Sequence, residues 1–429
     1  MSSEIENLYT RYAVSGTVST DTRKIQPGSI FFALKGDKYN ANEFAAEALE
    51  KGASWVVIDE AKYKTSDRYI LVDNVIETLQ QLAHYHRHQL QIPVIALTGS
   101  NGKTTTKELM QGVLSRKFKT MATRGNLNNH IGVPLTLLAI DASIEMAVVE
   151  MGANHLGEIA QLCHLANPTH GIITNIGKAH IGTFGGYENI VKAKFELYQH
   201  LKENQRVAFV NSQNPLLVAL AKPFSDPVYY PAEGDFYHAE LIDADPMVRI
   251  LADNGEEVQT QLVGSYNFEN IACALCVGKF FGVDPRLANE ALAEYVPGNM
   301  RSQVVKKATN TVILDAYNAN PSSMQASIEN MATAKADHKV LILGDMFELE
   351  AEADKEHRAI GKLIRDKGFE DVYLCGALFK AALQEIPTAK YFSRKEDLVR
   401  ELKQFPIAHA TILVKASRGI GLESIVEFL

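Results

Sequence analysis

The sequence predicts an α/β protein with mainly parallel sheets, divided among three domains, and three observations lead to this prediction. First, short apolar runs end repeatedly in Gly, Asn, Asp or Glu, and a stretch with helical spacing follows each of them. Apolar strands that alternate with helices are typical of parallel sheets covered on both faces. Second, 429 residues are too many for one ordinary domain. Third, proline or Pro-Gly interrupts the pattern at residues 91–93 and at Pro297-Gly298.

These interruptions divide the chain into domains at 1–92, 93–297 and 298–429. In the first, "GSIFFALKG" and "GASWVVIDE" are expected to be strands, and the helical stretch "ETLQQLAHYHRHQL" leads to a linker at 91–93. Pro297-Gly298 is the expected hinge before the third domain. Strands of the other two domains are expected within residues 93–100, 146–152, 171–177, 206–212, 311–318, 339–346, 371–376 and 411–417.

Composition excludes several classes of protein. A net charge of −8 gives no electrostatic footprint for nucleic acid. The N-terminus lacks a signal peptide and no apolar run is long enough to span a membrane, so we expect a cytoplasmic protein, and we expect a monomer. Four cysteines do not form a disulfide framework. Cys273 and Cys276 form a C-x-x-C pair, for which a buried helix face is favoured over a redox role.

The stretch "LTGSNGKTTTKELM" (97–110) resembles a phosphate-binding loop. The usual pattern G-x-x-x-x-G-K-[ST] requires glycine at position 97, where this chain has Leu97 and places its glycine at Gly99. The context is still that of a nucleotide site, because an apolar strand precedes the loop and a helix follows it. Backbone amides of the loop can hold phosphate oxygens, Lys103 can reach the β- and γ-phosphates, and the Thr104 hydroxyl can bind Mg²⁺.

Polar residues that close other strands are the candidates for further chemistry, because ligands bind beyond the carboxyl ends of parallel strands. Glu150 is the first acid after an apolar run and is a second candidate ligand of Mg²⁺. His180 lies in a glycine-rich loop, where a structural role is the alternative. Asp315 can bind ribose hydroxyls, and Arg301 at the domain junction can contact the transferred phosphate.

Lys194 interrupts an apolar helix stripe formed by Ile190, Leu197, Tyr198 and Leu201. A buried ammonium is costly unless it is paired or neutralised. Either the side chain extends to solvent, or its chemistry is changed. A neutral lysine amine can take up CO₂ to form a carbamate, which is an anion able to bind a metal.

Several motifs together resemble the Mur ligase family over essentially the whole chain. They are "TGSNGKTTT", "GNLNNHIGVPLTLL", "VVEMGANHLGEI", "TNIGKAHIGTFG", "AKFELY", "GSYNFENIACAL", "DAYNANPSSM", "GDMFELE" and "VKASRGIGLE", with "DTRKIQPGSIFFALKGDKYNANEF" in the N-terminal domain. "NNHIGVPLTLL", "YNANP" and "KASRG" resemble the branch that adds D-alanyl-D-alanine to UDP-N-acetylmuramoyl-tripeptide (UDP-MurNAc-tripeptide). The family uses a shortened T-G-x-x-G-K-[ST] loop, so Leu97 fits it.

The resemblance implies a fold and a reaction. The fold has a small UDP-sugar-binding domain, a central P-loop ATPase domain and a C-terminal Rossmann-like domain that brings the acceptor. In the reaction, a substrate carboxylate takes the γ-phosphate of ATP, and the amine of D-alanyl-D-alanine then attacks the acyl phosphate. Two Mg²⁺ ions are implied, one held by Thr104 and Glu150, the other by His180 and a carbamylated Lys194.

The resemblance also implies site residues. Catalytic roles fall on Lys103, Lys194, His180 and Arg301. Nucleotide contacts fall on Gly99, Ser100, Asn101, Gly102, Lys103, Thr104, Thr105, Asn267, Asn270, Arg301, Asp315 and Tyr317. Substrate contacts fall on Thr22, Arg23, Asn128, Asn129, Asn318, Ser417 and Arg418.

The chain departs from the family pattern at two places. Tyr266 stands where the family often has histidine, so any role of that histidine is in doubt, whereas Asn267 and Asn270 remain. "GDKYNANEF" replaces a common G-x-x-x-D-G-H-x-F, so contacts of this loop with the UDP-sugar should be altered.

Other functions stay open. A sister ligase that adds the third residue usually carries D-N-P-R, which is absent, and folylpolyglutamate synthase lacks this N-terminal domain. A P-loop switch or a small-molecule kinase is the alternative from another class, but the N-K-x-D motif of a GTPase is absent.

Overall fold

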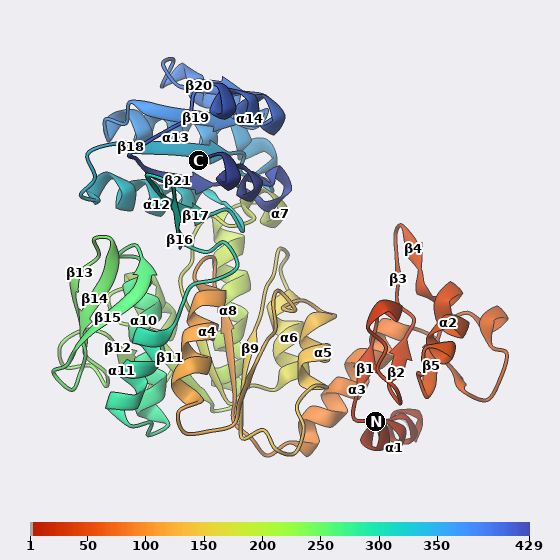
Figure 1. The fold of residues 1–429 in the computed structure, drawn as a ribbon. Helices are drawn as coiled ribbons and strands as arrows, with labels where there is room; N and C mark the ends of the chain where they lie inside the picture. The colour runs from red at the N-terminus through yellow and green to blue at the C-terminus, as the bar shows by residue number, and fades with distance from the viewer. Residues whose placement is uncertain (1–2) are drawn as a thin grey trace.

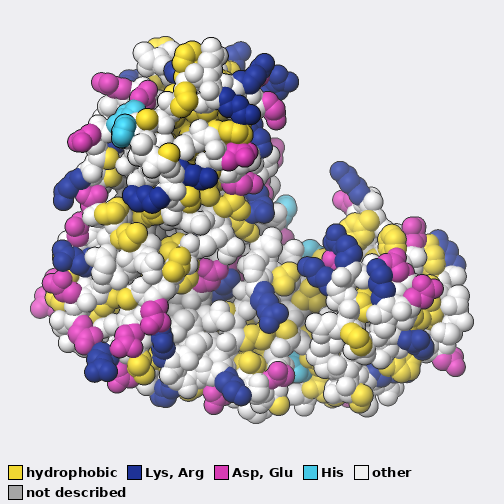
Figure 2. Space-filling model, viewed as in Figure 1, with side chains coloured by type: hydrophobic (Ala, Val, Ile, Leu, Met, Phe, Trp, Pro, Cys, Tyr) yellow, Lys and Arg dark blue, Asp and Glu magenta, His cyan; other side chains and the backbone are white. Residues whose placement is uncertain are grey.

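The computed structural model describes residues 3–429, which form three regions that follow one another along the chain (Figure 1). The N-terminal region lies to one side of the central one, and the C-terminal region stands above the central one. Figure 2 shows that the molecular surface is hollowed between the N-terminal region and the upright part. The predicted α/β class with mainly parallel sheets is confirmed.

The N-terminal region contains a four-stranded parallel sheet in the order β1-β2-β5-β6. The two predicted strand stretches contain β2 and β5, and the predicted helix is α3. A short antiparallel hairpin, β3–β4, projects from the sheet. The elements are α1 (Ser3–Ser15), β1 (Val18–Ser19), β2 (Ile30–Phe32), β3 (Lys35–Gly36), β4 (Tyr39–Asn40), α2 (Ala45–Glu50), β5 (Trp55–Ile58), β6 (Tyr69–Leu71) and α3 (Val75–Gln89), with 3₁₀ turns at Thr22–Lys24, Ala41–Phe44 and Ala61–Tyr63.

Helix α3 joins the N-terminal region to the central one by packing as well as by chain continuity. One apolar cluster includes Leu8 of α1, Leu82 of α3 and Ile159 of the central region, all of them buried. Arg87 of α3 is buried and its Nε donates a hydrogen bond of 2.8 Å to the carbonyl oxygen of Ala166. The Tyr12 hydroxyl donates to the carbonyl oxygen of Leu138 at 2.6 Å. The short stretch 91–93 therefore connects two bodies that already share a core.

The central region is built on a six-stranded parallel sheet in the order β12-β11-β10-β7-β9-β8. The chain leaves β7 first to one side and then to the other, so β7 is the topological switch point at which α/β sheets bind ligands. The elements are β7 (Val94–Thr98), α4 (Lys103–Leu114), β8 (Thr120–Ala122), α5 (Gly132–Leu137), β9 (Met146–Glu150), α6 (Glu158–Ala166), β10 (His170–Ile173), α7 (Ile181–Phe184), α8 (Tyr187–Glu203), β11 (Val207–Asn211), α9 (Pro215–Ala221) and β12 (Val228–Tyr230).

A three-stranded antiparallel sheet, β13-β14-β15, completes the central region and was not expected from the sequence. Its strands alternate buried and exposed residues, as β15 shows, so they lack the continuous apolar runs that mark buried parallel strands. Helix α10 is buried on nearly all sides and carries Cys273 and Cys276, which confirms their expected buried position. The elements are β13 (Glu240–Asp243), β14 (Met247–Leu251), β15 (Glu257–Val263), α10 (Asn267–Phe280) and α11 (Pro285–Glu294).

The C-terminal region has a six-stranded sheet in the order β16-β17-β21-β18-β19-β20, parallel except for the edge strand β16. All four strands expected here are present, and β21 inserts between β17 and β18, which brings the carboxyl ends of β17 and β21 together. The elements are β16 (Gln303–Lys307), β17 (Asn310–Asp315), α12 (Pro321–Thr333), β18 (Lys339–Gly344), α13 (Ala353–Asp366), β19 (Asp371–Cys375), β20 (Lys390–Phe392), α14 (Lys395–Gln404) and β21 (Thr411–Lys415), with 3₁₀ turns at Glu350–Glu352, Leu378–Gln384, Arg418–Ile420 and Leu422–Phe428.

An ion pair and several hydrogen bonds connect the central region to the C-terminal one. Lys178 Nζ lies 2.6 Å from Glu356 Oε1, and the carboxylate is buried. The backbone amide of Lys178 donates to Ser322 Oγ at 2.9 Å, and that of Gly182 donates to the carbonyl oxygen of Glu348 at 3.2 Å. Because the buried Glu356 carboxylate is shielded from solvent, its ion pair with Lys178 should contribute strongly to keeping the two regions together.

Replacing Lys178 by methionine is expected to open the molecule. The substitution leaves the buried Glu356 carboxylate without its cation at the contact, which favours separation of the regions. Small-angle X-ray scattering should show a larger radius of gyration than for the unmodified protein. Lys192→Met, at an exposed lysine on α8, is the matched control and should leave the scattering unchanged. Identical scattering of both variants and the unmodified protein would contradict the view that the Lys178–Glu356 ion pair holds the two regions together.

Candidate active site

The phosphate-loop candidate lies at the carboxyl end of β7 (Val94–Thr98). Leu97 is a buried residue inside β7 and pairs with Glu150 of β9. The loop therefore comprises only residues 99–102 before α4 begins at Lys103. The apparent missing glycine at position 97 is thus a strand residue.

The first and last loop positions require glycine. Gly99 has φ +147°, and a Cβ atom there would collide with Thr174 Oγ1 and lie 3.0 Å from the carbonyl oxygen of Asn175. Gly102 has φ +76°, and a Cβ atom there would lie 2.5 Å from Asn270 Oδ1. Such backbone conformations are readily available only to glycine.

Gly99→Ala is expected to lower the free energy of unfolding by about 1–3 kcal/mol and to weaken nucleotide binding, because the methyl group forces the loop away from Thr174. Gly112→Ala, in the interior of α4, is the matched control, since a Cβ atom there meets nothing within 4 Å. That variant should be stabilised by about 0.5–1 kcal/mol. Chemical denaturation measures both, and equal effects of the two substitutions would refute the steric argument.

Side chains from two regions hold the loop. The backbone amide of Asn101 donates to Asn175 Oδ1 at 3.0 Å, and its side-chain oxygen accepts a bond of 2.8 Å from Asn320 Nδ2 of the C-terminal region. The Ser100 hydroxyl donates to the carbonyl oxygen of Gly177 at 2.9 Å. The backbone amides of Ser100 and Asn101 both donate to Asn175, so neighbouring residues fix the candidate phosphate cradle in one geometry.

A cavity of about 610 Å³ opens over this loop between the central and C-terminal regions. Its walls bring together sixteen of the residues expected from the sequence. These are Ser100, Asn101, Gly102, Lys103, Thr104, Thr105, Asn128, Asn129, Glu150, His180, Asn267, Asn270, Arg301, Asp315, Tyr317 and Asn318. The walls do not include the expected residues Gly99, Lys194, Thr22, Arg23, Ser417 and Arg418.

Lys103 is the cation at the floor of the cavity. Its ammonium donates to the carbonyl oxygens of Gly99 at 2.7 Å and Ser100 at 3.4 Å. Burial lowers the pKa of Lys103, and the Glu150 carboxylate acts in the opposite direction. The ammonium is thus positioned by the loop itself, within the phosphate cradle.

Thr104 and Glu150 form a set of oxygen donors of the kind that Mg²⁺ prefers. The Thr104 hydroxyl donates to Glu150 Oε2 at 3.1 Å, and Asn128 Nδ2 donates to Glu150 Oε1 at 2.8 Å. Lys107, a buried lysine that we did not predict, lies 3.9 Å from Glu150 Oε2. Within residues 3–429 no group of three or more His, Cys, Asp and Glu residues is arranged to hold a metal ion. These donors fit Mg²⁺ bound jointly with nucleotide phosphates, which is its usual mode.

His180 lies on the cavity wall and faces an acidic residue of the C-terminal region. Its Nδ1 is 2.6 Å from Glu348 Oε2, and this contact lowers the pKa of Glu348. His180 itself has φ +56°, a conformation that is uncommon for a residue other than glycine and that tends to be found at functional sites. The structure thus places the imidazole where the central and C-terminal regions meet.

Lys194 is buried on α8, next to the cavity wall. Its Nζ donates to the carbonyl oxygen of Ala153, a wall residue, at 3.3 Å and lies 5.3 Å from the centre of the Phe184 ring. Burial lowers the pKa of Lys194 to about 7, and the Lys103 charge acts in the same direction. The alternative in which the ammonium extends to solvent is wrong, because the residue is 2% exposed. A substantial fraction of this amine is neutral near pH 7, as carbamate formation requires.

Arg301 and Asp315 enter the cavity from the C-terminal region. The Arg301 Cζ atom lies 3.8 Å from the centre of the Tyr317 ring. The residues on either side, Met300 and Ser302, have positive φ. Asp315 ends β17 and contacts Lys415, Ser327 and the backbone of Ser302. A flat aromatic ring, a guanidinium and a carboxylate are therefore grouped on one wall.

Asn267 and Asn270 line the cavity, but their side-chain amides form hydrogen bonds with other groups of the protein. Asn270 Oδ1 accepts a bond of 2.9 Å from Thr106, and its Nδ2 donates to Asn267 Oδ1 at 2.8 Å. Tyr266, the departure from the family pattern, shares a hydrogen bond of 2.8 Å with the Ser302 hydroxyl. Burial raises the pKa of Tyr266, so it stays a neutral phenol. Tyr266 thus ties the start of α10 to the loop that carries Arg301.

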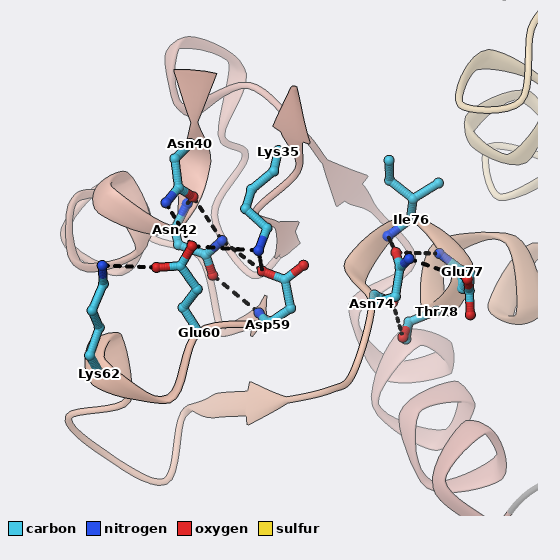
Figure 3. Close-up of polar contacts among 10 residues, drawn as sticks. All are labelled: Lys35, Asn40, Asn42, Asp59, Glu60, Lys62, Asn74, Ile76, Glu77 and Thr78. Atoms are coloured by element: carbon cyan, nitrogen blue, oxygen red, sulfur yellow. Dashed lines mark hydrogen bonds and ion pairs between the residues drawn. The ribbon is translucent and has the colours of Figure 1, made fainter. Parts of the chain in front are cut away.

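The N-terminal candidates Thr22 and Arg23 do not line this cavity. Arg23 is bound to Asp21 through Nε at 2.9 Å and is largely exposed. In the 3₁₀ turn that follows the hairpin β3–β4, the fully buried Asn42 donates to Asn40 and Asp59, each at 2.9 Å (Figure 3). Lys35 Nζ lies 3.0 Å from Asp59 Oδ1. The departing stretch "GDKYNANEF" therefore forms an asparagine-based network that fixes the hairpin.

Ser417 and Arg418 occupy a neighbouring position behind the cavity wall. Ser417 is buried, and its hydroxyl donates to the carbonyl oxygen of Ala319 at 3.2 Å and accepts from the amide of Phe347 at 2.9 Å. Arg418 lies 5.1 Å from the Tyr317 ring. Ser417 therefore fixes the segment that carries Asn318. Of the two residues, Arg418 is the one that carries a charge.

Sequence reasoning missed Asn175, Asn320, Lys415 and Glu348. Asn175 and Asn320 stand inside motifs that had been recognised, so their place beside better-known residues was the available signal. Lys415 and Glu348 also stand inside quoted motifs, "VKASRGIGLE" and "GDMFELE". Only the order of the strands and the contact between regions bring them to Asp315 and His180.

Comparison with known proteins agrees with this geometry. Residues 97–278 match the Mur ligase middle domain, and residues 300–418 match the Mur ligase glutamate ligase domain. A relative from Bacillus subtilis, named UDP-N-acetylmuramoyl-tripeptide--D-alanyl-D-alanine ligase, is 34% identical, with 96% of this chain and 92% of the relative covered. The Escherichia coli protein of the same name is 33% identical, with 96% and 93% covered.

Solved structures give the same result. The crystal structure of MurF from Acinetobacter baumannii has a TM-score of 0.86 and 30% identity, with 96% of this chain and 92% of that chain covered. MurF ligase from Thermotoga maritima in complex with ADP has a TM-score of 0.83 and 26% identity, with 100% and 98% covered. With two domain models that cover most of the sequence and relatives that match it nearly end to end, the chain belongs to the Mur ligase family.

Proposed function

We propose that the chain is an ATP-dependent amide ligase that joins D-alanyl-D-alanine to UDP-MurNAc-tripeptide. The observation that carries this proposal is that the phosphate loop, Glu150, Arg301 and Asp315 line one cavity. The relatives that match the chain nearly end to end bear that activity in their names. The product is the UDP-MurNAc-pentapeptide used in peptidoglycan synthesis. ATP and a nucleotide-linked sugar are cytoplasmic substrates, so we place the reaction in the cytoplasm.

The chemistry follows from what a carboxylate cannot do. An amine does not displace oxide from a carboxylate, so the substrate carboxylate oxygen first attacks the γ-phosphorus of ATP, which gives an acyl phosphate and ADP. The amine of D-alanyl-D-alanine then attacks the acyl carbon and forms a tetrahedral intermediate. Loss of a proton and departure of inorganic phosphate leave the amide.

The chain's own residues reduce the repulsion between the two anions that must meet. Lys103 in the loop and Arg301 on the opposite wall place positive charge on both sides of the transferred phosphate, where charge is spread in the transition state. Thr104 and Glu150 would hold one Mg²⁺, and His180 with a carbamylated Lys194 a second, as the family resemblance implies. Bound Mg²⁺ would neutralise phosphate oxygens.

The substrates are assigned to three regions of the molecule. ATP occupies the loop, with its ribose at Asp315 and its base near Tyr317, Asn267 and Asn270. The tripeptide passes Asn128 and Asn129, and its UDP end reaches the N-terminal region near Thr22 and Arg23. D-Alanyl-D-alanine approaches from the side of Asn318 and Arg418, with Ser417 as a support.

The proposed domains are 1–92, 93–297 and 298–429, with Pro297-Gly298 as the hinge. The segment lies in the loop between α11 and β16. Exchange of both residues for alanine is expected to lower the turnover number severalfold, because it removes the fixed φ of Pro297 and the conformational freedom of Gly298 from the segment that must guide closure. Unchanged turnover together with an unchanged scattering curve on addition of nucleotide would show that the hinge lies elsewhere.

Phosphate release from Mg-ATP, measured with the lysine and the diaminopimelate forms of UDP-MurNAc-tripeptide, tests the function. Phosphate that appears only with both the tripeptide and D-alanyl-D-alanine, together with pentapeptide in the mass spectrum, is the expected result. Release that ignores D-alanyl-D-alanine would refute this acceptor and favour another ligase of the superfamily. Release that ignores every UDP-sugar would favour a nucleotide switch. The same preparation in light scattering tests the monomer.

A further inference from the structure

Lys415 is a buried lysine on the cavity wall that the proposed mechanism does not use. It is the last residue of β21, and the sheet register pairs it with Asp315, the last residue of the neighbouring strand β17. The side chain is 2% exposed. Its Nζ forms an ion pair with Asp315 Oδ2. A buried lysine is costly unless it is paired, and this one is directed at a carboxylate that lines the cavity.

The two oxygens of the Asp315 carboxylate differ in the number of hydrogen bonds that they accept from the protein. Oδ2 accepts from Lys415 Nζ and from the Ser327 hydroxyl, at 3.1 Å for the latter. Within the described residues 3–429, Oδ1 accepts only from the backbone amide of Ser302, at 3.3 Å. A carboxylate oxygen has two lone-pair sites, so Oδ1 keeps acceptor capacity for a ligand while Oδ2 is committed to the protein.

We propose that Lys415 is a positioning residue for nucleotide: it fixes Asp315 through Oδ2, so that Oδ1 accepts a hydrogen bond from the ribose hydroxyls. The charged donor and Ser327 grip the same oxygen from two directions and so set the rotation of the carboxylate. Without this grip, Asp315 would turn among several orientations and lose part of its binding energy to ordering. The inference rests on the proposed function, because it takes Asp315 as the ribose contact.

The test compares the affinities of two nucleotides, ATP and 2′,3′-dideoxy-ATP, by isothermal titration calorimetry. The unmodified protein should bind ATP about tenfold more tightly, since a hydrogen bond to a charged group is then lost with the hydroxyls. Lys415→Met should weaken ATP about tenfold and leave dideoxy-ATP unchanged, so that discrimination disappears. Lys415→Arg should restore part of it, because it keeps the charge.

Two further variants keep the test decisive. Lys390→Met removes a lysine of the same sheet that pairs with Glu401 at 3.0 Å and does not line the cavity, so both affinities should stay unchanged. Ser327→Ala removes the other donor to Oδ2 and keeps the ion pair, and it should reduce discrimination by a smaller factor. If Lys415→Met does not fold by circular dichroism, Ser327→Ala carries the test alone.

The outcomes separate this inference from the proposed function. Equal weakening of both nucleotides by Lys415→Met would mean a purely structural ion pair and would overturn the inference. No discrimination by the unmodified protein would overturn it as well, because the ribose hydroxyls would then not be bound. Either result is compatible with an active ligase, whereas the proposed function fails only if the unmodified protein forms no pentapeptide.

Discussion

Lys103→Met is expected to lower the turnover number for phosphate release by about a hundredfold or more. The Lys103 ammonium is held in the loop by the carbonyl oxygens of Gly99 and Ser100, so its charge needs no reorganisation when phosphate is transferred. Methionine keeps the length of the side chain and removes only the charge. Steady-state phosphate release at saturating substrates measures the effect.

The control for Lys103 separates charge at the loop from charge in general. Lys192→Met, at an exposed position on α8, should leave the turnover number unchanged. The thermal midpoint of Lys103→Met should stay close to that of the unmodified protein, because burial already disfavours the charged form of Lys103 and its loss removes that cost. A turnover number within threefold of the unmodified protein would rule out a catalytic role for Lys103.

Lys194→Met is expected to lose activity by about a hundredfold or more and at the same time to gain stability. The activity is lost because neither a carbamate nor an amine is left beside Ala153, and added bicarbonate should not restore it. The stability is gained because a methionine fits the apolar surroundings, whereas the ammonium must be desolvated there. Few residues combine both outcomes, and the combination is typical of a group kept for function.

The pH dependence of that stability gain has a definite sign. The pKa of Lys194 is about 7 in the folded chain and near the ordinary 10.5 in the unfolded one. Between these values the unfolded state binds more protons, so the unmodified protein becomes more stable as the pH rises. The advantage of Lys194→Met should therefore be largest below pH 7 and should shrink as the pH approaches 10.5.

Chemical denaturation at pH 6, 8 and 9.5 measures this difference in the free energy of unfolding. Lys192→Met is the control, because an exposed lysine has no desolvation cost to lose. A difference that stays constant with pH would show that Lys194 does not carry a charge that burial disfavours. Full activity of Lys194→Met would refute the carbamate proposal whatever its stability.

The sequence determined the scaffold of this protein. Eight apolar runs in the central and C-terminal regions are strands where they were expected, because a strand buried on both faces must be continuously apolar. The 3.6-residue period alone placed Lys194 on the apolar face of a helix and left open whether its ammonium reaches solvent, and the structure shows the side chain buried on α8. The family motifs located most of the cavity wall, since many of their residues lie where a strand ends or a helix begins.

Only the tertiary structure decided which of these residues meet and how each is held. Lys415 reaches Asp315 because β21 lies beside β17 in the sheet, and this pairing brings together residues that are 100 positions apart in the chain. The antiparallel sheet β13-β14-β15 was missed, since alternating strands leave a weaker pattern than buried ones. Side-chain period and turn chemistry are local properties written along the chain, whereas strand order and contacts between domains arise from packing of distant segments, for which no local pattern exists.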